Sequence, residues 1–135
     1  MDIEKLVSFA IDAIKLSKPF FRGTDLLGAA VLTESGNIYQ GAYISANVGY
    51  LSRHAEDTAI INAVLHQDSD IVAIAIVSKK DEGTDNLCPP CGVCRELIFE
   101  YAQKNKHDID VVMANPNGKY IVKKISELMP YPWKG

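Results

Sequence analysis

Residue types that bind metal ions stand in two short stretches of the chain. The stretch SRHAEDTAI, residues 52–60, carries His54 and Glu56 where a polar loop turns into an apolar run. A second stretch, CPPCGVC at residues 88–94, carries all three cysteines of the sequence. Neutral histidine and cysteine thiolates are common zinc ligands in proteins. Acidic residues also gather at helix N-termini for capping and dipole reasons, so the first stretch taken alone fits an ordinary helix start.

The cysteine cluster is compatible with three kinds of chemistry. An iron–sulfur run of this spacing needs a fourth cysteine after three more residues, and that position holds Ile98. Buried, inert cysteines are common, but a cluster of three around a double proline is hard to explain in that way. Zinc is the third kind, because Cys91-x2-Cys94 is a known two-ligand turn of both structural and catalytic sites. The odd number of cysteines argues against a disulfide framework.

His54 can supply the third zinc ligand beside Cys91 and Cys94. With three protein ligands bound, the fourth position is open for water, which distinguishes a catalytic zinc from a structural one. Glu56 lies two residues from a ligand, so its carboxylate can reach that water and move protons. The sequence therefore predicts a catalytic Zn²⁺ site with Glu56 as its general acid and base. The pattern leaves Cys88 as either a competing ligand or a nearby thiol.

Both stretches are expected to begin helices. Residues 55–66 are apolar on most sides, as in a buried helix. The double proline before Cys91 is expected to break the chain and to pre-set the first turn of a helix that continues to Ala102. Two helix dipoles would then point their positive ends at the metal and help to keep the cysteines as thiolates.

The remaining segments are expected to form one sheet. A tight turn at 35–37 joins the first two strands into a hairpin, and the nearly unbroken apolar run at 71–78 belongs in the middle of the sheet. An amphipathic helix is expected at 3–16. The expected strands cover residues 26–33, 38–43, 71–78, 108–116 and 119–125, followed by an irregular C-terminal tail. This order predicts an α/β fold in which one mixed sheet lies between helices.

Length and charge limit the class of protein. The 135 residues, with 47% hydrophobic and 23% charged side chains, predict a single domain over residues 1–135. The net charge of −3 and the absence of a basic cluster argue against a polynucleotide or an anionic membrane as a partner. Charged residues interrupt the N-terminal apolar pattern, which fits neither a signal peptide nor a spanning helix. We therefore expect a cytoplasmic protein.

The two stretches resemble the motifs of the cytidine deaminase family. HAE at 54–56 is similar to the first family motif, and PCGVCRE at 90–96 to the second, Pro-Cys-Gly-x-Cys-Arg. The resemblance extends to GAA at 28–30 and to the C-terminal ELMPYPW. It implies a cytidine deaminase-like, three-layer α/β/α fold with a mixed five-stranded sheet. It also implies a homodimer or homotetramer with active sites at subunit contacts.

The same resemblance implies which residues contact the substrate. The backbone N–H of Ala55 would anchor the ring carbonyl. Tyr43 and Ser45 stand where nucleoside-specific members carry the Asn and Glu that hold the ribose. Asp25 replaces an aromatic residue that flanks the pyrimidine, and could meet a cationic or amino-bearing substituent. Trp133, in the proline-stiffened tail, is expected at or beside an active site, either that of its own chain or that of a neighbouring subunit.

The predicted function is zinc-dependent hydrolytic deamination of cytidine or a related aminopyrimidine nucleoside, with release of ammonia. Because the Asn-x-Glu pair is missing, a deaminase of a modified or antibiotic aminopyrimidine nucleoside, like blasticidin S deaminase, is the alternative. A tRNA or polynucleotide deaminase is disfavoured by the acidic charge. A non-enzymatic, zinc-stabilised interaction module is the remaining hypothesis, and it would leave Glu56 without a role.

Overall fold

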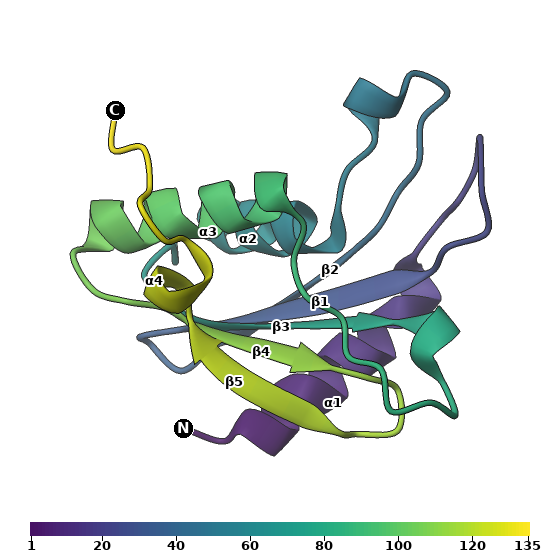
Figure 1. The fold of residues 1–135 in the computed structure, drawn as a ribbon, viewed down its shortest axis with the longest axis horizontal. Helices are drawn as coiled ribbons and strands as arrows, with labels where there is room; N and C mark the ends of the chain where they lie inside the picture. Colours follow the sequence, from purple (N-terminus) through teal and green to yellow (C-terminus); the bar gives the residue numbers. More distant parts are fainter.

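A five-stranded mixed sheet divides the computed structural model, which covers residues 1–135, into three layers (Figure 1). The strands lie in the order β2-β1-β3-β4-β5; β3 and β4 are parallel, and all other neighbours are antiparallel. The strands are β1 (Leu27–Thr33), β2 (Ile38–Ala42), β3 (Ile71–Ser78), β4 (Asp110–Ala114) and β5 (Tyr120–Lys124). The predicted α/β/α fold with five strands is confirmed.

Helices cover both faces of the sheet (Figure 1). One face carries α1 (Ile3–Ala13), and the other carries α2 (Ala55–Leu65) and α3 (Gly92–Asn105). A short helix, α4 (Ile125–Leu128), follows β5 and lies beside α3. The β3 strand is the third of five and contributes buried side chains to both faces, as its apolar sequence predicts.

Small residues let α1 approach the sheet closely. The face of the sheet beneath α1 is rich in alanine, including Ala30, Ala73 and Ala75. At Gly28 an added Cβ would lie 2.3 Å from the backbone oxygen of Ala10, so only glycine fits there. The opposite face carries larger side chains, such as Ile74 and others of the same core, against α2 and α3.

One carboxylate fastens the β1–β2 hairpin to the loop that follows α2. The Oδ2 atom of Asp68 accepts hydrogen bonds from Thr33 (2.9 Å), Ser35 (2.7 Å), Asn37 (3.0 Å) and Tyr39 (2.8 Å). These donors, Asn37 first and then Ser35 and Tyr39, hold the pKa of Asp68 far below its usual range. The predicted turn at 35–37 is present, with Gly36 at φ 92°.

Most element boundaries differ by a few residues from the sequence prediction, and two regions differ in kind. Pro89 and Pro90 precede α3 instead of forming its first turn, because Cys91 is the N-cap residue, with an extended backbone at ψ 170°. Residues 125–128, predicted as the end of a strand and an irregular tail, form α4. The Glu127 carboxylate accepts a hydrogen bond of 2.9 Å from the Lys124 N–H, which stabilises the start of this short helix.

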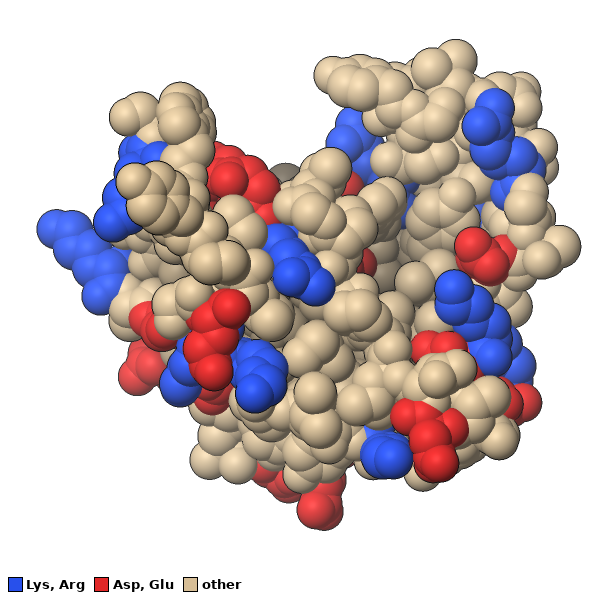
Figure 2. All heavy atoms as spheres, in the orientation of Figure 1, with Lys and Arg blue, Asp and Glu red and all other residues tan.

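The surface is of mixed charge. On the face shown in Figure 2, acidic and basic side chains are interspersed, and a notch opens between the C-terminal segment and the loop after β2. None of the helices has the length and the apolar content needed to cross a bilayer.

Candidate active site

The N-termini of α2 and α3 meet at three potential metal ligands. His54 is the N-cap residue of α2 and Cys91 that of α3, while Cys94 lies in the first turn of α3. The Nδ1 atom of His54 lies 3.3 Å from the Sγ atoms of both Cys91 and Cys94. The three ligand atoms lie within 4.8 Å of one another. The structure thus brings together the three residues that the sequence proposes as ligands.

The geometry and chemistry of this group fit a zinc ion. A tetrahedral zinc with bonds of about 2.0–2.1 Å to nitrogen and about 2.3 Å to sulfur holds these two atoms about 3.5 Å apart. The observed distances of 3.3 Å are close to that separation. Burial, followed by the nearby Glu56 and Cys91, raises the pKa of Cys94 far above its usual range. A bound cation removes this cost, because it stabilises the thiolate.

Contacts with the sheet fix the start of α2. The Ala42 N–H donates a hydrogen bond of 2.8 Å to Thr58 Oγ1, so the end of β2 is tied to α2. At Gly41 an added Cβ would lie 2.1 Å from the backbone nitrogen of Ala59 and 2.5 Å from the oxygen of Ala55. The absence of a side chain at Gly41 therefore sets the height of α2, and of its cap residue His54, above the sheet.

Arg95 fixes the loop that carries the cysteines. Its Nε donates to the backbone oxygen of Pro90 at 2.9 Å, and its Nη1 donates to that of Leu128 at 3.4 Å. Within the chain Arg95 therefore binds two backbone carbonyl groups and forms no ion pair with a carboxylate. It joins the turn before α3 to the end of α4.

Glu56 is buried directly beside the ligand group. Its side chain is 4% exposed, and burial raises the pKa of Glu56 above the ordinary carboxyl value. Hydrogen bonds from its own backbone N–H and from Cys94 oppose this shift. A carboxyl whose pKa is raised toward neutrality can both accept and donate protons, which is the property needed for acid–base catalysis.

A cavity opens above Glu56. It has a volume of about 310 Å³, and its walls are Asp25, Leu27, Tyr43, His54, Ala55, Glu56, Cys88, Pro89 and Cys91. The ring of Tyr43 meets that of His54 edge-on, with centroids 6.3 Å apart. Asp25, Tyr43 and Ala55, which the sequence proposes as substrate contacts, therefore face the same space as Glu56.

Two of the proposed substrate contacts lie elsewhere. The Ser45 side chain is buried, and its Oγ accepts a hydrogen bond of 3.2 Å from the N–H of Phe21. Trp133 is 77% exposed in the C-terminal segment and forms no part of the cavity wall. Within one chain the cavity therefore contains neither residue.

The structure also adds residues to the site. Cys88 lines the cavity, but its thiol is outside the group of metal-ligating atoms. Burial, with smaller effects from Glu56 and Asp81, raises the pKa of Cys88 to about 12, so this thiol stays neutral. Leu27 and Pro89 supply apolar wall. Only their position in the sequence, two residues from Asp25 and from Cys91 respectively, could have indicated them.

Comparisons with known proteins agree with this site. Residues 1–107 match the family model described as the cytidine and deoxycytidylate deaminase zinc-binding region. The chain is 35% identical over 132 residues to a cytidine deaminase of Halalkalibacterium halodurans, covering 96% of this chain and 92% of that protein. It is 34% identical over 108 residues to a blasticidin-S deaminase of Bacillus cereus, covering 77% of this chain and 74% of that protein.

The fold has close counterparts among solved structures. The crystal structure of cytidine deaminase from Burkholderia pseudomallei superposes with a TM-score of 0.84 at 26% sequence identity. The match covers 98% of this chain and 100% of that one.

Proposed function

The chain belongs to the cytidine and deoxycytidylate deaminase family, and from this premise we propose that it converts cytidine or a related aminopyrimidine nucleoside by hydrolytic deamination. It is a zinc-dependent hydrolase that acts on the C–N bond of a cyclic amidine. The observation that carries the proposal is the buried Glu56 carboxyl beside His54, Cys91 and Cys94 on the floor of a cavity. A non-enzymatic module would have no use for this arrangement.

The residues of the chain divide the chemistry among them. Zn²⁺ held by His54, Cys91 and Cys94 would supply the Lewis acidity that makes water a nucleophile near neutral pH. Glu56 takes a proton from the water while the water oxygen adds to the amine-bearing ring carbon. Glu56 then gives that proton to the adjacent ring nitrogen. A second proton passes through Glu56 to the departing amine, the C–N bond breaks, and ammonia leaves.

The start of α2 also orients the substrate in this proposal. Ala55 is the first residue of α2, and its backbone N–H has no partner within the helix. This N–H would donate to the ring carbonyl of the pyrimidine. Tyr43 and Asp25 form the walls around the bound ring and its substituent.

Incubation of the purified, zinc-loaded protein with cytidine tests the proposal directly. We expect ammonia and the corresponding uracil nucleoside in equal amounts. The same assay with deoxycytidine, cytosine and adenosine shows which base the enzyme deaminates and whether it needs the sugar. Turnover of an aminopurine without turnover of any aminopyrimidine would contradict the proposal.

A second candidate is a deaminase of a modified or antibiotic aminopyrimidine nucleoside. The buried Ser45 hydroxyl is already bonded to the backbone of Phe21, and Tyr43 and Asp25 replace the usual contacts. The similarity to a blasticidin-S deaminase is in line with this candidate. Blasticidin S and cytidine compared under the same conditions separate the two substrates.

We also propose a domain organisation, an oligomeric state and a cellular location for the protein. Residues 1–135 act as a single deaminase domain that assembles into a homodimer or homotetramer. Two large apolar side chains exposed beside the ligand group, Tyr50 and Val93, support the assembly, as does the exposed Trp133 in the C-terminal segment. A cytoplasmic location suits a site that needs Cys91 and Cys94 as free thiols, since reducing conditions keep them available.

A further inference from the structure

The catalytic cavity has a neighbouring chamber. The chamber has a volume of about 540 Å³ and shares part of its wall, including Asp25 and Cys88, with the catalytic cavity. Beyond Cys88 the wall is formed by the end of β3 and the loop that follows it, with Ser78, Lys80 and Asp81. A ligand in the catalytic cavity could therefore extend into this chamber.

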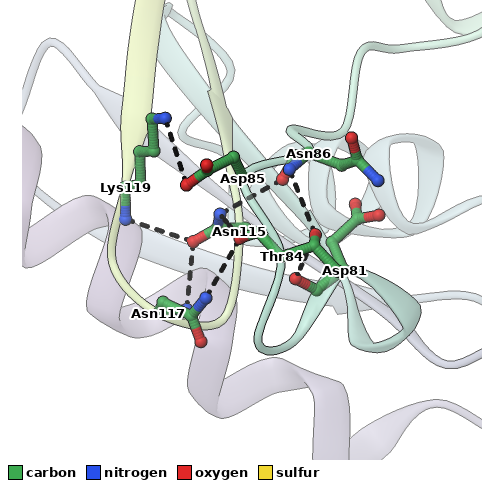
Figure 3. A network of polar contacts seen from close by, with 7 residues as sticks. All are labelled: Asp81, Thr84, Asp85, Asn86, Asn115, Asn117 and Lys119. Carbon is green, nitrogen blue, oxygen red and sulfur yellow. Dashed lines mark hydrogen bonds and ion pairs between the residues drawn. The ribbon is translucent and has the colours of Figure 1, made fainter.

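Two buried polar side chains of the chamber have no partner in the protein. Ser78 is 2% exposed and Asp81 is 5% exposed. The hydroxyl of Ser78 takes part in no hydrogen bond within the protein, and the carboxylate of Asp81 takes part in neither a hydrogen bond nor an ion pair. In the network of Figure 3 only the backbone oxygen of Asp81 is bonded. Buried polar groups are nearly always paired, because losing water without a replacement partner costs free energy. The oxygens of Ser78 and Asp81 are not among the enclosed atoms without a partner, so they face the open space of the chamber, where a ligand that donates hydrogen bonds can replace the water that solvates them.

The wall that carries Asp81 is held rigidly (Figure 3). The amide of Asn115 donates hydrogen bonds of 3.1 Å to the backbone oxygens of both Thr84 and Asn86. The hydroxyl of Thr84 in turn donates to the backbone oxygen of Asp81 at 2.7 Å. The network uses the backbone of Asp81 and leaves its carboxylate free, as expected for a group that is pre-organised for binding.

The charges of the chamber favour a cation. Asp25 and Asp81 contribute two carboxylates, and Lys80 contributes one ammonium group, which forms no ion pair with either. The Cys88 thiol feels the negative charge of Glu56 on the catalytic side and that of Asp81 on the chamber side. The chamber thus begins next to the reacting group.

We propose that this chamber binds a positively charged, hydrogen-bond-donating substituent of the substrate, an amine or a guanidine, through Asp81, Ser78 and Asp25. The inference rests on the proposed deaminase function and specifies its substrate class. The preferred substrate is then an aminopyrimidine nucleoside that carries a cationic arm, instead of cytidine itself.

Pairs of matched analogues test the proposal. Each pair carries either an aminopropyl group or a neutral butyl group at the same position of cytidine: the C5 carbon, the N4 amine or the 5′ oxygen. For at least one position we expect kcat/KM to favour the cationic member by about tenfold or more, as is typical of a charged hydrogen bond. Asp81→Asn should reduce this preference at least tenfold, and Ser78→Ala should reduce it less.

A nearby carboxylate provides the matched control. Asp85 lies in the same loop, but its side chain is 96% exposed and pairs with Lys119, so Asp85→Asn should leave the preference as it is in the wild type. If the enzyme turns over cytidine but has equal kcat/KM values for the cationic and neutral members of every pair, the proposed role of the chamber is wrong and the proposed deaminase function stands. An absence of ammonia from every pyrimidine would overturn the proposed function and this inference with it. If circular dichroism shows that Asp81→Asn does not fold, the Ser78→Ala variant provides the test: an unchanged preference for the cationic member would then contradict the proposal.

Discussion

His54 Nδ1 lies 3.3 Å from Cys94 Sγ, although the two residues are 40 positions apart in the chain. Cys91 completes the group at the same distance from His54. Two helix starts must therefore be held together before a metal can bind, and a bound metal must in turn stabilise the folded chain.

The first prediction is one zinc ion per chain, bound by His54, Cys91 and Cys94. Elemental analysis of the purified protein should give a zinc-to-chain ratio near one. The double variant Cys91→Ser/Cys94→Ser should lose the metal and unfold at a lower temperature, because two of the three ligands are gone. Cys88→Ser should keep the metal, since its thiol lies outside the ligand group. Iron as the main metal, or zinc retained by the double variant, would contradict this prediction.

The second prediction concerns Glu56. Glu56→Gln should keep zinc and the fold but lose nearly all turnover, because a carboxamide cannot carry protons. General acid–base groups contribute roughly 10²–10⁴ in rate, and a residue used in several steps should reach the upper end. Glu100→Gln, an exposed change on α3, should leave kcat and KM unaltered. A Glu56→Gln enzyme within about tenfold of the wild type would mean that Glu56 is only a helix-start residue.

The third prediction is that Gly41 and Gly92 differ sharply in their tolerance of alanine. A Cβ at Gly41 would overlap the backbone of α2, whereas a Cβ at Gly92 meets nothing within 4 Å. Overpacking typically costs about 1–3 kcal/mol, and here a whole helix must move away from the sheet. Gly41→Ala should therefore lower both the unfolding temperature and the zinc content, and Gly92→Ala should change neither. Equal zinc content in the two variants would show that α2 is not positioned by Gly41.

The fourth prediction is a pH dependence of stability through Asp68. Hydrogen bonds lower the pKa of Asp68 in the folded state. Such a carboxyl stabilises the fold above its unfolded pKa of about 3.9, and this contribution is lost as the pH falls toward the folded value. Asp68→Asn should melt below the wild type at pH 7, and the difference should narrow below about pH 4. Asp85→Asn is the exposed control. A difference that stays constant down to pH 3 would point to lost packing instead of lost charge.

The sequence indicates the proposed metal ligands and the strands of the sheet because both depend on local features. Residue type and short spacing identify Cys91 and Cys94, and apolar periodicity identifies the strands. The position of Ser45 could not be predicted in this way, since its hydroxyl is bonded to Phe21, 24 positions earlier in the chain. The four residues of α4 are too few to show a helical period. The lack of a partner for the Asp81 carboxylate also depends on tertiary structure. Asn115, from a distant strand end, fixes the backbone of the loop that carries Asp81.

The last prediction is weak discrimination between ribose and deoxyribose. A site built to hydrogen-bond a substrate hydroxyl can reject an analogue without it by about 10⁴–10⁵, because its buried polar groups are then left unpaired. In this cavity the Ser45 hydroxyl is already bonded to backbone, and the side chains beside Glu56 that remain for a sugar are Tyr43 and the exposed Asp25. Asp25 keeps its contact with water and loses little when a hydroxyl is absent.

Cytidine and deoxycytidine should therefore be deaminated with kcat/KM values within about tenfold of each other, far below the discrimination of a hydroxyl-binding site. Tyr43→Phe should reduce both values by a similar factor, because it removes one hydroxyl and keeps the ring that packs against His54. Steady-state kinetics on the two nucleosides, with the wild type and Tyr43→Phe side by side, provide the measurement. A wild-type preference for cytidine of about 10³ or more would contradict this prediction. If Tyr43→Phe also removed that preference, Tyr43 would be a specific contact to the ribose 2′-hydroxyl.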